Sequence, residues 1–119
     1  MEQPNRFQKL VAEAKKNITE ITPAEAQGEV ERGAVLIDVR EEESFREEHL
    51  PGAKHLTRGM VELEIEDEVP DLNQPIIIYC GGGSRGALAT ESLQKMGYTN
   101  VRSIRGGLRA WKAEGRPTE

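Results

Sequence analysis

Residues 76–86 read IIIYCGGGSRG, and this stretch decides the fold class of the 119-residue chain. Three isoleucines followed by a tyrosine are typical of a strand that is buried on both faces of a parallel sheet. Cys80 ends this strand, and the glycines that follow it favour a tight turn. Residues 87–96 then carry apolar side chains at helical spacing, and Gly97 is a typical helix terminator. A strand, a glycine-rich turn and a helix in this order indicate an α/β protein.

The same alternation of strands and helices extends over the rest of the chain. We expect a helix at residues 60–69, although Val61, Leu63 and Ile65 alternate with glutamates as in a strand, because glutamate is depleted from strands. Apolar spacing and turn residues predict helices over 4–16, 22–33, 41–49 and from 106 onward, and strands over 17–21, 34–39, 53–56 and 101–104. The predicted fold is therefore a three-layer α/β/α arrangement around a central parallel sheet of about five strands.

Local signals mark two of the helix starts. Pro4 suits the first turn of the N-terminal helix, which we expect Asn17 to stop. Thr22 and Glu25 have the spacing of a capping box, with Pro23 at the first helical position. The second helix is therefore predicted to begin immediately after Thr22.

The composition excludes several classes of protein. A length of 119 residues with 36% hydrophobic residues is enough for one domain with one core. The mean hydropathy of −0.62 argues against a transmembrane helix, and the first ten residues lack the pattern of a secretory signal. Sixteen Lys and Arg residues against 21 Asp and Glu residues give a net charge of −5, which argues against general nucleic-acid binding. We expect a cytoplasmic protein that binds neither nucleic acid nor membranes.

Cys80 is the single cysteine of the chain. One cysteine cannot form an internal disulfide, and the sequence offers no set of zinc ligands, so we expect no metal. The thiol is either a small buried core residue or a reactive nucleophile.

The surroundings of Cys80 bear on this choice. In parallel sheets, ligands bind beyond the carboxyl ends of the strands, where Cys80 is predicted to lie. The glycines at 81, 82, 83 and 86 allow several backbone N–H groups to point at one place, and the helix that follows adds partial positive charge. Arg85 can contribute a fixed charge and bind an oxyanion at two points. Together these features favour a thiolate, but a packing cysteine beside an ordinary turn remains an alternative. The loop lacks the Gly-Lys-Ser/Thr ending of a nucleotide-binding P-loop.

Several short motifs follow one another in a fixed order along the chain. They are Leu36-Ile37-Asp38-Val39-Arg40, Phe45 with Glu48-His49-Leu50-Pro51-Gly52-Ala53, Ile76-Ile77-Ile78-Tyr79-Cys80, Cys80-x-x-Gly83-x-Arg85, Gly97-Tyr98 with Val101, and Gly106-Gly107-Leu108 with Trp111. In this combination the sequence resembles the single-domain rhodanese family of sulfurtransferases. The resemblance spans residues 18–116, so we expect a rhodanese-like domain at 18–119 and an N-terminal helical extension at 1–17.

The resemblance implies a sulfur-transfer reaction without a cofactor. The Cys80 thiolate would attack the outer sulfur of a donor such as thiosulfate and keep that sulfur as a persulfide. A thiophilic acceptor, such as cyanide, a thiol or a sulfur-carrier protein, would then remove it. The loop that holds the persulfide would consist of Gly81, Gly82, Gly83, Ser84, Arg85 and Gly86.

Two other functions are compatible with the same motifs. A rhodanese-like module without activity can serve in docking or regulation, although such a module has no reason to keep Cys80. Related phosphatases and arsenate reductases carry a loop one residue longer, which fits a tetrahedral oxyanion. The loop from Cys80 to Arg85 has six residues and resembles that of the sulfurtransferases, so sulfur transfer is the preferred hypothesis.

Other polar residues near the predicted site are expected to support it or to lie apart from it. Asp38 and Arg40 follow a predicted buried strand and are expected to orient the active loop through hydrogen bonds or an ion pair, more than to contact substrate. Arg58 is either a pocket residue or a solvated surface arginine. His49 and His55 are expected in a turn and a strand, because a thiolate nucleophile needs no general base.

Overall fold

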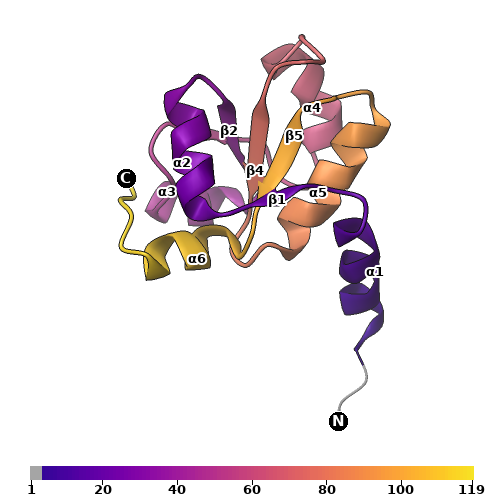
Figure 1. Cartoon of the computed structure of the whole chain (residues 1–119), viewed down its shortest axis with the longest axis horizontal. Helices are drawn as coiled ribbons and strands as arrows, with labels where there is room; N and C mark the ends of the chain where they lie inside the picture. The colour runs from indigo at the N-terminus through magenta and orange to yellow at the C-terminus, as the bar shows by residue number, and fades with distance from the viewer. Residues whose placement is uncertain (1–3) are drawn as a thin grey trace.

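A five-stranded parallel sheet forms the centre of the computed structural model, which describes residues 4–119 (Figure 1). Residues 1–3 of the predicted N-terminal extension lie outside the described residues. The strand order is β1-β5-β4-β2-β3. The strands are β1 (Glu20–Ile21), β2 (Val35–Asp38), β3 (Lys54–His55), β4 (Ile76–Tyr79) and β5 (Val101–Ile104). The helices are α1 (Arg6–Lys15), α2 (Pro23–Glu31), α3 (Glu42–Glu47), α4 (Val61–Glu68), α5 (Ser84–Lys95) and α6 (Gly107–Ala113).

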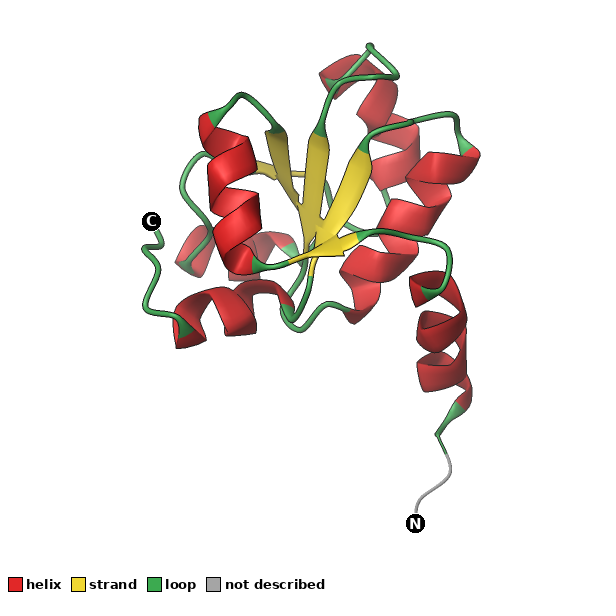
Figure 2. Ribbon diagram, in the orientation of Figure 1, coloured by secondary structure: helices red, strands yellow, loops and turns green. Residues whose placement is uncertain are grey.

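Helices cover both faces of the sheet, as Figure 2 shows. One cluster of buried residues joins Ile76 and Ile78 of β4 to side chains of α4 and α5. A second cluster joins Ile77 and Tyr79 of the same strand to side chains of α2 and α6. Successive residues of β4 thus alternate between two cores, and all four are buried. The three-layer α/β/α fold with a parallel sheet is therefore confirmed.

Two of the local predictions are also confirmed. The Thr22 side chain accepts a hydrogen bond from the Glu25 amide, and the Glu25 side chain accepts one from the Thr22 amide. Residues 61–68 form a helix in which Val61 and Ile65 are fully buried while Leu63 is 74% exposed. A spacing of four between buried residues is helical, so it decides against the strand reading of this segment.

Most helix starts differ from the sequence predictions by one to three residues. Helix α5 begins at Ser84 instead of residue 87, because Gly83 adopts a left-handed conformation with φ of 104° and starts the helix directly after the turn. Helix α1 begins at Arg6 instead of in the turn of Pro4, because Asn5 caps it with a complete capping box. Helix α3 begins at Glu42, one residue later than expected.

The topology places Cys80 at the carboxyl end of the central strand, β4. It follows β4, which has β5 on one side and β2 on the other. Helix α1 packs against α5 (Figure 1), and its residues Val11 and Ala14 are buried. Within residues 4–119, every helix is too short or too polar to cross a lipid bilayer.

Candidate active site

The Cys80 thiol lies inside a turn whose amides point at it. Its Sγ atom accepts hydrogen bonds from the backbone N–H groups of Gly83 at 3.1 Å and Gly86 at 3.2 Å. The Gly86 amide belongs to the first turn of α5, where N–H groups lack partners within the helix. Gly83 makes this approach possible, since its φ of 104° suits glycine and strains other residues. Both amides therefore present the positive ends of their N–H dipoles to the sulfur atom.

Helix α6 holds the first part of the loop from outside. The Leu108 amide donates to the Cys80 carbonyl at 2.9 Å, and the Arg109 amide donates to the Gly81 carbonyl at 2.9 Å. These two carbonyl groups are thereby engaged by α6, while the amides of Gly83 and Gly86 serve the sulfur. The loop is fixed between two helix starts, so its geometry is set before a substrate arrives.

Arg85 lines the opening above Cys80 and is tied to an acidic neighbour. Its guanidinium donates a hydrogen bond of 2.5 Å to Glu41, the residue that precedes α3. This hydrogen bond lowers the pKa of the Glu41 carboxyl. The Glu41 carboxylate therefore partly neutralises the charge of Arg85, although the Arg85 side chain still borders the pocket.

A pocket of about 450 Å³ opens over the thiol. Its lining comes from α1, the loop, the start of α5 and α6, and consists of Phe7, Cys80, Gly81, Gly82, Ser84, Arg85 and Arg109. Phe7 and Arg109 were not predicted from the sequence, since each is distant from Cys80 along the chain. Two glycines with positive φ, Gly106 and Gly107, precede Arg109 and are the local sign that α6 approaches the loop closely.

Asp38 and Arg40 form a buried ion pair beside the loop. The Arg40 guanidinium contacts both carboxylate oxygens of Asp38, the shortest distance being 2.7 Å, and also donates to the Glu48 carbonyl at 2.6 Å. Neither residue lines the pocket. Asp38 pairs in register with Tyr79, the residue before Cys80, and burial together with the Asp38 charge raises the pKa of Tyr79. The ion pair of Asp38 and Arg40 is therefore placed to hold the carboxyl ends of β2 and β4.

Three further residues considered from the sequence lie outside the pocket lining. Arg58 pairs with Glu62 at 2.8 Å, and its second nitrogen lies 3.5 Å from the Ser92 hydroxyl. His49 contacts the Phe45 carbonyl through Nδ1 at 2.9 Å, and His55 contacts the Arg40 carbonyl through Nε2 at 2.7 Å. All three are thus held by partners from neighbouring segments.

Comparisons with known proteins agree with this architecture. The model of the "Rhodanese-like domain" family matches residues 22–114. The chain is 34% identical over 93 residues to thiosulfate sulfurtransferase GlpE of Pseudomonas savastanoi, covering 78% of this chain and 86% of that protein. It is 38% identical over 92 residues to the protein of the same name from Haemophilus influenzae, covering 77% and 86%.

Solved structures show the same likeness over more of the chain. A protein of unknown function from Rhodopseudomonas palustris, described as a possible tyrosine phosphatase, superposes with a TM-score of 0.82 at 33% identity, covering 100% of this chain and 99% of that one. A polysulfide-sulfur transferase homodimer from Wolinella succinogenes has a TM-score of 0.82 at 26% identity, covering 95% and 86%. The chain belongs to the rhodanese-like domain family.

Proposed function

We propose that this protein is a sulfurtransferase in which Cys80 carries sulfur as a persulfide. The observation that carries the proposal is the pair of amide hydrogen bonds from Gly83 and Gly86 to Sγ. The names of the GlpE relatives support a donor of the thiosulfate type. The expected acceptors are cyanide, a small thiol or a sulfur-carrier protein.

The first half-reaction transfers the outer sulfur of thiosulfate. The Cys80 thiolate attacks this sulfur, a sulfur–sulfur bond forms at Sγ, and the bond to the sulfonate group breaks with its electron pair leaving on sulfite. One thiolate charge and two thiosulfate charges become one persulfide charge and two sulfite charges, so the step needs no oxidant or reductant. The amides that face Sγ are well placed to stabilise the anionic persulfide.

The second half-reaction regenerates the thiolate. A nucleophile attacks the outer sulfur of the persulfide, and the electron pair of the broken bond returns to Sγ. Since Cys80 is the single cysteine, no other thiol of the same chain can accept this sulfur. Steady-state kinetics should therefore follow a ping-pong pattern.

Phosphatase activity is the second candidate, because the Rhodopseudomonas palustris relative is described as a possible tyrosine phosphatase. Two observations favour sulfur transfer. The loop from Cys80 to Arg85 has six residues, and in this length it resembles the loop of the sulfurtransferases. The guanidinium of Arg85 is directed to Glu41, whereas a phosphatase needs its loop arginine on the transferred phosphoryl group.

We also propose that residues 4–17 are an extension that completes the pocket of the 18–119 domain. Phe7 of α1 lines the pocket, and α1 packs on α5 with Val11 and Ala14 buried.

The cytoplasm is the proposed compartment, because thiol acceptors remain reduced there.

One experiment separates the two activities. The wild-type protein and the Cys80→Ser variant are incubated in parallel with thiosulfate or with p-nitrophenyl phosphate. The proposal expects the wild type to gain one sulfur atom by intact mass and to release no nitrophenol, and the variant to gain nothing. Release of nitrophenol without sulfur loading would favour the phosphatase assignment instead.

A further inference from the structure

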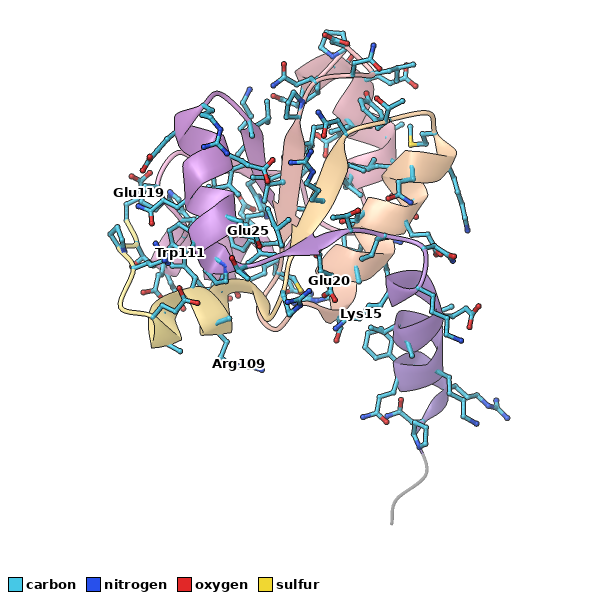
Figure 3. The ribbon with its side chains drawn as sticks, viewed as in Figure 1. Lys15, Glu20, Glu25, Arg109, Trp111 and Glu119 are labelled. Carbon is cyan, nitrogen blue, oxygen red and sulfur yellow. The ribbon has the colours of Figure 1, made fainter. Side chains whose placement is uncertain are left out.

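Arg109 lies over the glycine loop in a position that α6 determines. Its backbone amide donates a hydrogen bond to the Gly81 carbonyl at 2.9 Å, so the start of α6 fixes where the side chain leaves the helix. A β-carbon built on Gly82 would lie 3.0 Å from the Arg109 Nη1 atom, which places the guanidinium directly against the loop. Figure 3 shows the side chain on the side of α6 away from the sheet. The absence of a side chain at Gly82 thus makes room for this guanidinium.

The charges of the two pocket arginines are balanced differently. Arg85 is paired with Glu41 at 2.5 Å. Within residues 4–119, no carboxylate forms an ion pair with Arg109. Arg109 therefore supplies the uncompensated positive charge on the wall of the Cys80 pocket.

We propose that Arg109 is the donor-binding residue of this site and selects donors with an anionic group next to the transferred sulfur. The inference rests on the proposed sulfur transfer. A planar guanidinium binds two oxygens of a sulfonate at once, and its charge is not already neutralised by a neighbour. In thiosulfate these oxygens belong to the leaving sulfite, which gains negative charge as the sulfur–sulfur bond breaks. Arg109 would thus bind the donor and also stabilise the departing group.

The first test measures the charge preference of Cys80 without turnover. Iodoacetate and iodoacetamide alkylate a thiolate by the same displacement of iodide, and they differ in one negative charge. Taking the ratio of their rates for each variant cancels changes in thiolate population and in general access. With one cysteine in the chain, intact mass follows the alkylation of a single thiol.

The expected result is a fall in the iodoacetate to iodoacetamide ratio of about tenfold in Arg109→Gln. Lys112→Gln is the matched control, because Lys112 lies on the same helix and pairs with Glu48 at 2.8 Å, but does not line the Cys80 pocket. Its ratio should change less than about twofold, since a screened charge acts weakly at a distance. Equal changes in the two variants would overturn the assignment of Arg109.

The second test uses the proposed reaction. Arg109→Gln should lower kcat/KM for thiosulfate by about ten- to a hundredfold, while Arg109→Lys should recover part of the loss. Discharge of the preloaded persulfide to cyanide should change less than about threefold, because sulfite has already left. If the wild type loads no sulfur, the proposed function fails. If it loads sulfur and Arg109→Gln matches Lys112→Gln, only the role of Arg109 is refuted.

Discussion

Replacing Gly107 by alanine tests whether α6 fixes the loop that follows Cys80. Gly107 has a φ of +56°, and a methyl carbon there would overlap the carbonyl oxygen of Cys80. It would also lie 3.0 Å from the carbonyl carbon and oxygen of Gly81. These atoms are backbone and cannot move aside as a flexible side chain would. Alanine must therefore push α6 away from the loop or pull the loop out of shape.

The size of the effect follows from two contributions. An alanine in the left-handed region costs about 1–2 kcal/mol, and overpacking adds about 1–3 kcal/mol. Gly115→Ala is the matched control, because Gly115 has a φ of +73° and no atom within 4 Å of the added carbon. The control carries only the conformational part, so Gly107→Ala should be less stable than Gly115→Ala by about 1–3 kcal/mol.

Urea unfolding measures this difference, and persulfide formation measures its consequence. Gly107→Ala should load sulfur roughly ten- to a hundredfold more slowly than the wild type, because a displaced loop no longer directs its amides at Sγ. Gly115→Ala should load at the wild-type rate. Equal stability of the two variants, with normal loading in both, would refute the argument that contacts between α6 and the loop set the site.

Three further predictions concern the surroundings of the loop. Asp38→Ala should lower the free energy of unfolding by about 3–5 kcal/mol, because it leaves the Arg40 charge buried without its partner; a loss below about 1 kcal/mol in urea unfolding would contradict this. The hydrogen bond from Arg85 lowers the pKa of Glu41, so its stabilising effect is present above the ordinary carboxyl pKa and disappears as the pH falls through the lowered value. NMR titration should show this pKa rising in Arg85→Gln, and an unchanged pKa would exclude the pair in solution. Val11→Asp should accelerate hydrogen exchange in α1 but not in β4, because Val11 is buried where α1 packs on α5; uniform exchange changes would argue against a separate extension.

Much of the fold could be predicted because its signals are local or strongly periodic. The capping box of Thr22 and Glu25 involves residues three apart, so the sequence contains all of it. The run Ile76–Tyr79 is apolar at every position, as a central parallel strand requires. Residues 60–69 were ambiguous because Val61, Leu63 and Ile65 also fit an alternating pattern. Only tertiary packing shows that Leu63 is exposed.

The arrangement of the candidate site could be predicted in part for the same reason. Cys80, Gly83 and Gly86 are close in sequence, and their positions after a buried strand place them at a sheet edge. Arg109 is brought to the loop by hydrogen bonds between α6 and carbonyl groups distant along the chain. Phe7 arrives through the packing of α1 on α5, which has no motif of its own. From the sequence, Arg58 could be either a pocket residue or a surface arginine. In the structure it forms an ion pair with Glu62.

The mass of the intact protein after exposure to thiosulfate shows whether Cys80 accepts sulfur. Since the chain has one cysteine, any stable sulfur gain on a thiol must be on Cys80. The wild type should gain one sulfur atom, lose it again when cyanide is added, and release thiocyanate in equal amount. The Cys80→Ser variant should remain unchanged. A wild-type protein that keeps its original mass, and catalyses no transfer from thiosulfate to cyanide, would contradict the proposed sulfurtransferase function.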